Sequence, residues 1–433
     1  MTVITRFAPS PTGRLHVGNL RAALHNWLWA RKNGGRFLLR IDDTDVARST
    51  EANVDAIRTD LDWLGLNHDG EERQSLRFDL YEAKFEALKA AGRVYACYET
   101  PEELDLRRKV LLGRGLPPIY ERPPVNSVPP EGRAPHWRFR LDHDVMIAWD
   151  DLIRGPQHFD AAKLSDPVIR RADGSWLYLL PSVIDDIEMG VTHVVRGEDH
   201  VSNTASQIQM FSALEATPPA FAHEALLTGS EGKLSKRLGS LDCDELRAAG
   251  IEPLAIAGLL ARLGTSDPVE PVTELAVLAE TIEFARFGRA PARFDMAELE
   301  TLNAKTIHMM PFAAVSDRLP AGVDEAAWTA IRPNLKTIAE AADWWRIVTG
   351  PVETAVADED RAFIAQAAEV AATLDWSADP WHALTGALKA SSGRTGKALF
   401  LPLRRALTGL DHGPDMAALL PIIGRERAIS RLV

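Results

Sequence analysis

Cysteine is nearly absent from this sequence of 433 residues, which contains only Cys97 and Cys243. Two widely separated cysteines support neither a disulfide framework nor a metal site made of thiolates. No apolar run is long enough to cross a membrane, and the first residues lack the pattern of a signal peptide. We therefore expect a protein of the reducing cytoplasm that has no membrane partner.

Internal repeats and low-complexity tracts are also absent, and apolar residues make up 46% and charged residues 25% of the chain. This composition is typical of a globular protein, and the length is enough for two to four domains. The formal net charge of −12 is only weak evidence against a nucleic-acid partner, because binding depends on local basic patches. One basic bias occurs in residues 394–433, with seven basic and three acidic residues.

The stretch from Arg6 to Asp45 predicts a β-α-β unit. A short apolar segment at 3–8 is followed by two prolines and a glycine, and apolar residues then recur at helical spacing from Gly18 until a glycine pair. Residues 37–41 form a second apolar segment that predicts a buried strand. In a parallel sheet of this kind, the ligand crevice lies at the carboxyl ends of the strands.

The turn between the first strand and the helix contains the residues best suited to chemistry. Thr12, His16 and Asn19 lie just before or inside the first helical turn, where free backbone N–H groups and the helix dipole favour a phosphate chain. Gly13 and Gly18 allow the backbone to approach a ligand closely. His16 could donate a hydrogen bond to a phosphate oxygen, although a lone histidine near a helix start is usually a capping or surface residue.

The segment FAPSPTGRLHVGN resembles the first nucleotide-binding motif of class I aminoacyl-tRNA synthetases, in its glutamate-specific form. The family carries a second motif near the end of the catalytic domain, and residues 233–237, KLSKR, are similar to it. Two motifs in the expected order are much stronger evidence than either motif alone. The sequence is therefore identified as a member of the bacterial glutamate–tRNA ligase family over essentially its whole length.

This resemblance implies a parallel-sheet, Rossmann-like α/β catalytic domain with an α+β insertion, followed by an all-α C-terminal anticodon-binding region. Alternating apolar residues between 95 and 185 independently suggest antiparallel strands in the insertion. We expect most tryptophans of the C-terminal region to be core residues, although aromatic rings can stack on anticodon bases. The expected parts are the first half of the catalytic domain (1–94), the insertion that binds the tRNA acceptor end (95–185), the second half with the KLSKR loop (186–240), a helical stem-contact region (241–305) and the helical anticodon-binding region (306–433).

Members of the family often carry a zinc site in the insertion, built from cysteines and a tyrosine. Cys97 and Tyr120 are present here, but Glu99 stands where a second cysteine would be, and residues 122–124 offer no third. Structural zinc requires four ligands, which are mostly thiolate or imidazole groups. We therefore predict no zinc and no other metal bound by protein ligands.

The resemblance implies that ATP with Mg²⁺ is a substrate and that His16, Lys233 and Lys236 are catalytic. The two lysines and a neighbouring arginine on one loop could surround a triphosphate and stabilise the charge that grows on the α-phosphate and on pyrophosphate. Mg²⁺ would be held largely by phosphate and water. The predicted ATP-binding residues are Pro9, Thr12, Gly13, His16, Gly18, Asn19, Lys233, Leu234, Ser235 and Lys236.

A glutamate pocket needs a cation for the side-chain carboxylate and an acceptor for the ammonium group. By resemblance, Arg6 and Arg196 are the carboxylate readers. Asp42 matches the ammonium-binding acid of the family, where Glu is usual, and Ser182 stands where some relatives have Asn. The predicted glutamate-binding residues are Arg6, Ala8, Ser10, Asp42, Tyr178, Ser182 and Arg196.

The leading hypothesis is ATP-dependent attachment of L-glutamate to the 3′ end of tRNA(Glu) through a glutamyl-adenylate, with tRNA(Gln) left open as a second substrate. A glutamyl-queuosine tRNA synthetase-like enzyme is disfavoured by the helical region after about residue 305. The arginines at 6 and 196 disfavour a glutamine–tRNA ligase. The intact nucleotide motifs oppose a non-catalytic tRNA-binding paralogue. We expect a monomer, since no exposed heptad or zipper pattern occurs.

Overall fold

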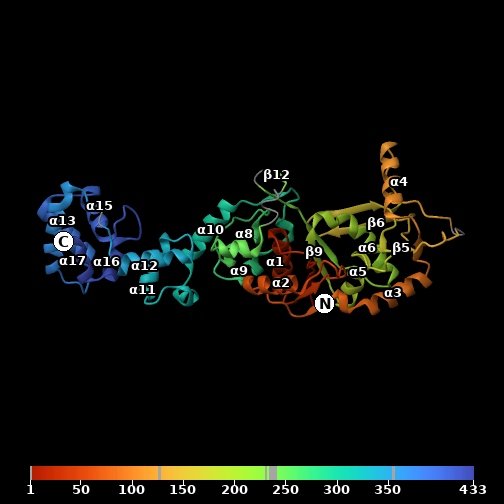
Figure 1. Ribbon diagram of the computed structural model, residues 1–433, viewed down its shortest axis with the longest axis horizontal. Helices are drawn as coiled ribbons and strands as arrows, with labels where there is room; N and C mark the ends of the chain where they lie inside the picture. The colour runs from red at the N-terminus through yellow and green to blue at the C-terminus, as the bar shows by residue number, and fades with distance from the viewer. Residues whose placement is uncertain (1, 125–127, 230–231, 234–240, 354–355) are drawn as a thin grey trace. The chain divides into compact units, whose positions relative to one another are not determined.

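The structure is a computed structural model that describes residues 2–124, 128–229, 232–233, 241–353 and 356–433 (Figure 1). The chain forms two compact units. Among the described residues, no helix combines the length and apolarity needed to cross a membrane. Unit 1 consists of Met1–Leu246 and Ile256–Asp295, and unit 2 consists of Arg247–Ala255 and Met296–Val433.

A parallel sheet forms the centre of unit 1. Strands β1, β2 and β3 pair in that order, and β9 pairs in parallel with β10. Strand β9 lies beside β1, on the side of β1 away from β2. The backbone N–H of Thr192, just before β9, donates to the carbonyl oxygen of Ile4 in β1 (2.9 Å). The loops that follow β1 and β9 therefore open at the same edge of the sheet. The strands are β1 (Ile4–Phe7), β2 (Arg36–Ile41), β3 (Glu71–Arg73), β9 (His193–Gly197) and β10 (Ala220–Glu224).

Helix α1 (Val17–Lys32) connects β1 to β2 and confirms the predicted β-α-β unit. Its N-terminus is a capping box: the Nδ1 of His16 accepts from the backbone N–H of Gly18, and the backbone N–H of His16 donates to Asn19 Oδ1. The helix is followed by Gly34, whose φ of 59° favours glycine. The capping residues thus fix His16 at the carboxyl end of β1.

Further helices belong to the sheet region. Helix α2 (Glu51–Leu64) begins after Thr50, whose hydroxyl caps the helix, and ends at Gly65 with a φ of 74°. Helix α5 packs with α3 in one apolar core, and residue 185, the expected end of the insertion, lies inside this helix. The other helices are α3 (Phe78–Ala90), α5 (Leu179–Glu188) and α6 (Val201–Ala213).

The insertion contains antiparallel strands, as its alternating apolar residues predict. Strands β4, β5 and β8 form one antiparallel sheet, and β6 and β7 form a hairpin. Helix α4 projects away from the rest of the insertion and buries no residue (Figure 1). The elements are β4 (Val94–Cys97), α4 (Pro101–Gly113), β5 (His136–Phe139), β6 (Met146–Asp151), β7 (Gly155–Asp160) and β8 (Val168–Arg170).

After the sheet, the chain is mainly helical, with a small sheet in the order β12-β11-β13. The two-residue strand β13 is an addition to the expected helical region 241–305. Short 3-10 turns connect many elements and lie at Gln74–Leu76, Ala161–Lys163, Glu198–His200, Phe284–Arg286, Phe312–Ala314, Ser316–Arg318, Arg332–Asn334, Ile338–Glu340 and Asp358–Asp360. The other elements here are β11 (Leu227–Gly229), β12 (Gly232–Lys233), α7 (Cys243–Ala248), α8 (Pro253–Arg262), α9 (Leu275–Thr281) and β13 (Ala292–Arg293).

Unit 2 is helical in its described residues, and its helices pack around one apolar core. Trp328 and Trp381 are buried in this core, and Trp344, Trp345 and Trp376 pack against it, as expected for core tryptophans. The helices are α10 (Met296–Met309), α11 (Glu325–Ile331), α12 (Ala341–Thr349), α13 (Arg361–Thr373), α14 (Pro380–Ser392), α15 (Lys397–Thr408), α16 (Met416–Ile423) and α17 (Arg425–Leu432).

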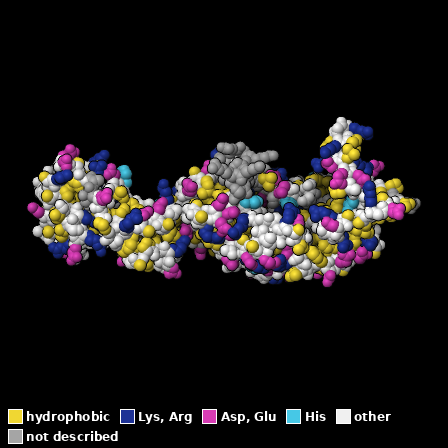
Figure 2. Space-filling view, in the orientation of Figure 1, with side chains coloured by type: hydrophobic (Ala, Val, Ile, Leu, Met, Phe, Trp, Pro, Cys, Tyr) yellow, Lys and Arg dark blue, Asp and Glu magenta, His cyan; other side chains and the backbone are white. Residues whose placement is uncertain are grey.

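The basic bias of residues 394–433 is largely used inside unit 2. The guanidinium of Arg431 donates to the carbonyl oxygens of Leu407, Ile347, Val348 and Gly350. Arginines 425 and 427 also donate to carbonyl oxygens near helix ends, and arginines 394 and 405 form ion pairs. On the face of unit 2 seen in Figure 2, basic and acidic side chains are interspersed.

Candidate active site

A cavity of about 760 Å³ opens where the carboxyl ends of β1 and β9 meet the N-terminus of α1. Its volume lies in the usual range for small-molecule sites. Of the predicted site residues outside the KLSKR loop, Ser182 is the only one that does not line it. The side chains of Lys233, Leu234, Ser235 and Lys236 lie outside the described residues. The predicted residues that line the cavity are Arg6, Ala8, Pro9, Ser10, Thr12, Gly13, His16, Gly18, Asn19, Asp42, Tyr178 and Arg196.

The imidazole of His16 is arranged as a neutral hydrogen-bond donor. Its Nδ1 accepts from the backbone N–H of Gly18 (3.1 Å), so the ring proton is on Nε2. Burial lowers the pKa of His16 below its usual 6.5. A Cβ at position 18 would lie 3.0 Å from His16 Cε1, which explains why glycine is suited to this position. Among the described residues, no hydrogen-bond partner of Nε2 is found, so its N–H can bind a ligand oxygen.

Arg6 and Asp42, which line the cavity, belong to a buried network of charged side chains that also includes Arg40 and Asp186. Arg40 binds both oxygens of Asp42 (2.7 and 3.2 Å) and also binds Asp186 (2.7 Å). Asp186 in turn accepts from the Nε of Arg6 (3.0 Å). All four side chains are at most 4% exposed, so their charges are compensated mainly by each other. Arg40 and Asp186 were not predicted as site residues.

The two carboxylates of this network differ in their pKa. Burial raises the pKa of Asp42 to about 6, and the opposing attraction of Arg40 does not cancel this effect. Burial also acts on Asp186, but Arg6 and Arg40 together lower its pKa below the usual value. Ser182 does not line the cavity, but it contacts the network: its Oγ accepts a hydrogen bond from Arg40 (3.1 Å).

Arg196 is a buried cation without a carboxylate partner in the described part of the chain. Its Nη1 donates to the hydroxyl of Tyr178 (2.9 Å), and its Nη2 donates to Thr204 Oγ1 (2.6 Å) and Gln207 Oε1 (2.7 Å). Burial lowers its pKa, yet a guanidinium remains charged at neutral pH. An uncompensated guanidinium in a largely buried wall favours a ligand that carries an anionic group.

The insertion contains a second cluster of polar groups that bears on the prediction of no zinc. Cys97 and His136 are cross-strand partners in β4 and β5, and ligand atoms of Cys97, Glu99 and His136 lie within 4.8 Å of one another. The hydroxyl of Tyr120 lies 3.1 Å from Cys97 Sγ and 2.9 Å from Glu99 Oε1. The sequence alone did not place His136 in this cluster, because its strand pairing depends on the tertiary fold.

Two observations describe the electrostatics of this cluster. Burial raises the pKa of the Cys97 thiol, which favours its protonated form. The guanidinium of Arg138 lies 3.7 Å above the centre of the Tyr120 ring, so a positive charge is already present beside the cluster. Within the described part of the chain, the buried Nε2 of His136 has no hydrogen-bond partner.

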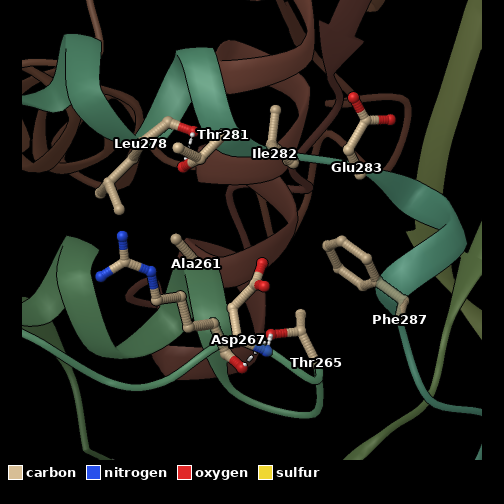
Figure 3. A pocket seen from close by; sticks show the side chains of 9 residues that line it. Ala261, Thr265, Asp267, Leu278, Thr281, Ile282, Glu283 and Phe287 are labelled. Carbon is tan, nitrogen blue, oxygen red and sulfur yellow. Dashed lines mark hydrogen bonds between the residues drawn. The ribbon is translucent and has the colours of Figure 1, made fainter.

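A further cavity of about 10 Å³ lies between α8 and α9 (Figure 3). Its lining includes Thr265, Asp267, Thr281 and Phe287. This volume has room for at most about one water molecule. The cavity is therefore too small to be a substrate site.

Comparison with known families agrees with this architecture. Residues 2–304 match the family model for tRNA synthetases class I (E and Q), catalytic domain, and residues 298–433 match the model for an anticodon binding domain. The fold and the site therefore define a class I aminoacyl-tRNA synthetase. This result confirms the predicted fold class.

Individual relatives narrow the family further. The chain is 72% identical to glutamate–tRNA ligase 2 of Sphingopyxis alaskensis, over 100% of this chain and 99% of the relative. It is 65% identical to glutamate–tRNA ligase 1 of Novosphingobium aromaticivorans, over the full length of both. A solved glutamate tRNA ligase of Elizabethkingia meningosepticum, in complex with its amino acid, superposes with a TM-score of 0.85 at 27% identity, over 100% of this chain and 98% of that one. The chain belongs to the glutamate–tRNA ligase family.

The geometry predicts the protonation state of His16. We expect a pKa below 6.5 and a proton on Nε2 at pH 7, because burial disfavours the imidazolium and Nδ1 already accepts from Gly18. NMR of protein labelled with ¹⁵N-histidine distinguishes the two ring nitrogens, and a His16→Gln variant assigns the signal. A pKa at or above 6.5, or a proton on Nδ1, would show that the cap hydrogen bond does not persist in solution.

Proposed function

We propose that this protein attaches L-glutamate to the 3′ end of tRNA(Glu), using ATP and passing through a glutamyl-adenylate. The observation that carries this proposal is one cavity with an ATP-motif turn on one side and an uncompensated guanidinium on the other. The first suits a phosphate chain, and the second suits the carboxylate that distinguishes glutamate from neutral amino acids. The names of the relatives support the same activity.

In the first step, the α-carboxylate of glutamate attacks the α-phosphorus of ATP and expels pyrophosphate. The 2′-hydroxyl of the terminal adenosine of tRNA then attacks the acyl carbon and releases AMP. We assign catalytic roles to His16, whose Nε2–H would donate to a phosphate oxygen, and to Lys233 and Lys236, whose side chains lie outside the described residues. Catalysis would depend on positioning and charge stabilisation rather than on a covalent enzyme intermediate. Mg²⁺ would enter as part of the ATP substrate.

The ATP-binding residues would be those of the loop between β1 and α1 and of the first helical turn of α1. Backbone N–H groups at the start of a helix and its dipole favour phosphate there. We assign ATP binding to Pro9, Thr12, Gly13, Gly18 and Asn19, which all line the large cavity. Leu234 and Ser235 complete the assignment by resemblance alone.

For the amino acid, we assign the side-chain carboxylate to Arg196, with Tyr178 beside it. Arg6 would be the second cation, although Asp186 already compensates part of its charge. Asp42 would accept from the ammonium group, and Ala8 and Ser10 would line the pocket. Ser182 would act through Arg40, which it contacts.

A glutamyl-queuosine tRNA synthetase-like enzyme remains the main enzymatic alternative, but the match of residues 298–433 to an anticodon binding domain disfavours it. We also propose a monomer that works in the cytoplasm, where tRNA and ATP are available. Whether tRNA(Gln) is a second substrate depends on tRNA recognition, which a charging assay measures directly.

The proposed activity predicts that labelled glutamate is transferred to purified tRNA(Glu) transcript in the presence of ATP and Mg²⁺. A tRNA(Gln) transcript in a parallel reaction determines the second substrate. Charging of tRNA(Glu) alone identifies a discriminating enzyme, and charging of both identifies an enzyme of the two-step route to glutaminyl-tRNA. If neither transcript is charged, the proposal of a ligase fails and a non-catalytic paralogue takes its place.

The raised pKa of Asp42 predicts a pH dependence of glutamate binding. As the pH falls through about 6, Asp42 gains a proton and loses the charge that attracts the ammonium group. For a single group of pKa about 6, the charged fraction falls about tenfold between pH 7 and pH 5, so we expect KM for glutamate to rise about tenfold. The Asp42→Asn variant should have a high KM without this titration. A wild-type KM that is constant over this range would refute the role of Asp42.

We further propose that the enzyme does not use zinc. A protonated Cys97 thiol, a tyrosine hydroxyl that already contacts Glu99, and the nearby Arg138 guanidinium make the cluster a poor site for a dication. The unpartnered Nε2 of His136 is the one feature that would suit a metal.

Elemental analysis of protein purified without added metal tests this proposal. We expect far less than one zinc per chain and full charging activity after treatment with a chelator and return of Mg²⁺. Replacing Arg138 with Gln provides a matched variant, because it removes the positive charge and keeps Cys97, Glu99, Tyr120 and His136. One equivalent of zinc in the wild-type protein would overturn the proposal.

A further inference from the structure

The two arginines of the amino-acid pocket are oriented in different ways. Arg6 is held by the carboxylate of Asp186, whereas Arg196 is held by neutral groups alone in the described part of the chain. One of these groups is His223, whose Nε2 lies 3.3 Å from the Nε of Arg196. The orientation of the Arg196 guanidinium therefore depends on the state of a histidine that does not line the cavity.

Asp151 fixes His223 from the opposite side. The Nδ1 of His223 lies 2.5 Å from Asp151 Oδ2, and both side chains are fully buried. Asp151 also accepts from the backbone N–H groups of His223 (3.1 Å), Ile153 (3.1 Å) and Arg154 (2.9 Å). Burial by itself would raise the pKa of Asp151, but these hydrogen bonds more than offset it, so the group remains an acceptor at neutral pH.

Only one protonation state of His223 fits both neighbours. A carboxylate only accepts, so Nδ1 must carry the proton that faces Asp151. The Nε–H of Arg196 only donates, so Nε2 must offer its lone pair. Burial lowers the pKa of His223, and the charges of Arg196 and Arg154 act in the same direction against the attraction of Asp151. Thr204 Oγ1, 2.9 Å from Nε2, can donate or accept.

We propose that His223 is a positioning residue: Asp151 selects its tautomer, and its Nε2 lone pair holds Arg196 in the orientation that receives the side-chain carboxylate of glutamate. This inference rests on the proposed assignment of Arg196 to that carboxylate. Asp151 is the last residue of β6, so the dyad also anchors the β6–β7 hairpin of the insertion to the wall of the pocket.

A second contact supports this anchoring. Arg154, in the turn of the same hairpin, donates to Glu198 (2.5 Å), which follows β9 directly. Glu198 also accepts from the backbone N–H of Leu226 (3.2 Å), after β10. The hairpin is thus bound at both strands that carry the proposed carboxylate reader and its positioning histidine.

The Asp151→Asn variant tests the choice of tautomer at nearly constant volume. The amide oxygen must accept the backbone N–H groups, which turns the NH₂ group toward His223 Nδ1. The imidazole then carries its proton on Nε2, and two donors face each other between His223 and Arg196. We expect KM for glutamate in tRNA(Glu) charging to rise about 10- to 100-fold, as for the loss of a hydrogen bond to a charged group, with kcat and KM for ATP close to wild type.

Two variants of His223 separate positioning from packing. His223→Asn keeps a donor for Asp151 and removes the acceptor for Arg196, so KM for glutamate should rise as in Asp151→Asn. His223→Gln can place its amide oxygen near the position of Nε2, so it should recover most of the affinity. His193→Asn, on β9 and outside the cavity, is the matched control and should leave KM unchanged. Equal losses of kcat and of thermal stability in both His223 variants would overturn the proposal.

The Arg196→Lys variant separates the proposed role of Arg196 from that of His223. If this variant leaves KM for glutamate unchanged, the assignment of Arg196 fails, and the positioning role fails with it. If it raises KM while Asp151→Asn and His223→Asn do not, Arg196 remains the reader and only the role of His223 is refuted. Should Asp151→Asn fail to fold, the contrast between His223→Asn and His223→Gln decides the question.

Discussion

The pairing of Arg40 with Asp42 and Asp186 is the interaction on which the proposed amino-acid pocket depends. Arg40 lies on β2 and Asp186 on α5, and the same Asp186 holds Arg6 on β1. Charges this deeply buried are tolerated only when they compensate one another and their hydrogen bonds are complete. The network thereby fixes three elements that are far apart in the sequence and determines where the cavity can carry charge.

This network gives the two arginines that line the cavity different electrostatic environments. Since Asp186 compensates Arg6, the positive potential that remains for a ligand comes mainly from Arg196, whose partners are neutral. A neutral amide would leave that guanidinium buried without an anion, which is costly. In the proposed function, selectivity for a carboxylate would therefore follow from the lack of a carboxylate partner at Arg196, and the presence of two arginines in the sequence does not reveal this asymmetry.

Local features of the fold could be predicted from the sequence, but contacts across the sheet could not. Thr50 and Gly65 mark the ends of α2, and the turn around His16 follows from its proline and glycine residues, because caps and turns are set by neighbours in the chain. The role of Arg40 could not be predicted in this way. A charged residue inside the apolar segment FLLRI, and two acids after the apolar segment LLPSVI, were signals of buried ion pairs, but only the fold shows which groups pair.

The contacts of Arg40 also bear on the role that we propose for Asp42 as acceptor of the ammonium group. In the sequence, Asp in place of the usual Glu makes the geometry of an ammonium site doubtful, since the carboxylate is one methylene shorter. In the structure, both oxygens of Asp42 are fixed by Arg40, and each keeps a second lone pair. A rigid pair can place an acceptor as firmly as a longer and freer side chain, because less conformational entropy is lost when the ligand binds. The position of the carboxylate is therefore decided by Arg40 as much as by the length of the side chain that carries it.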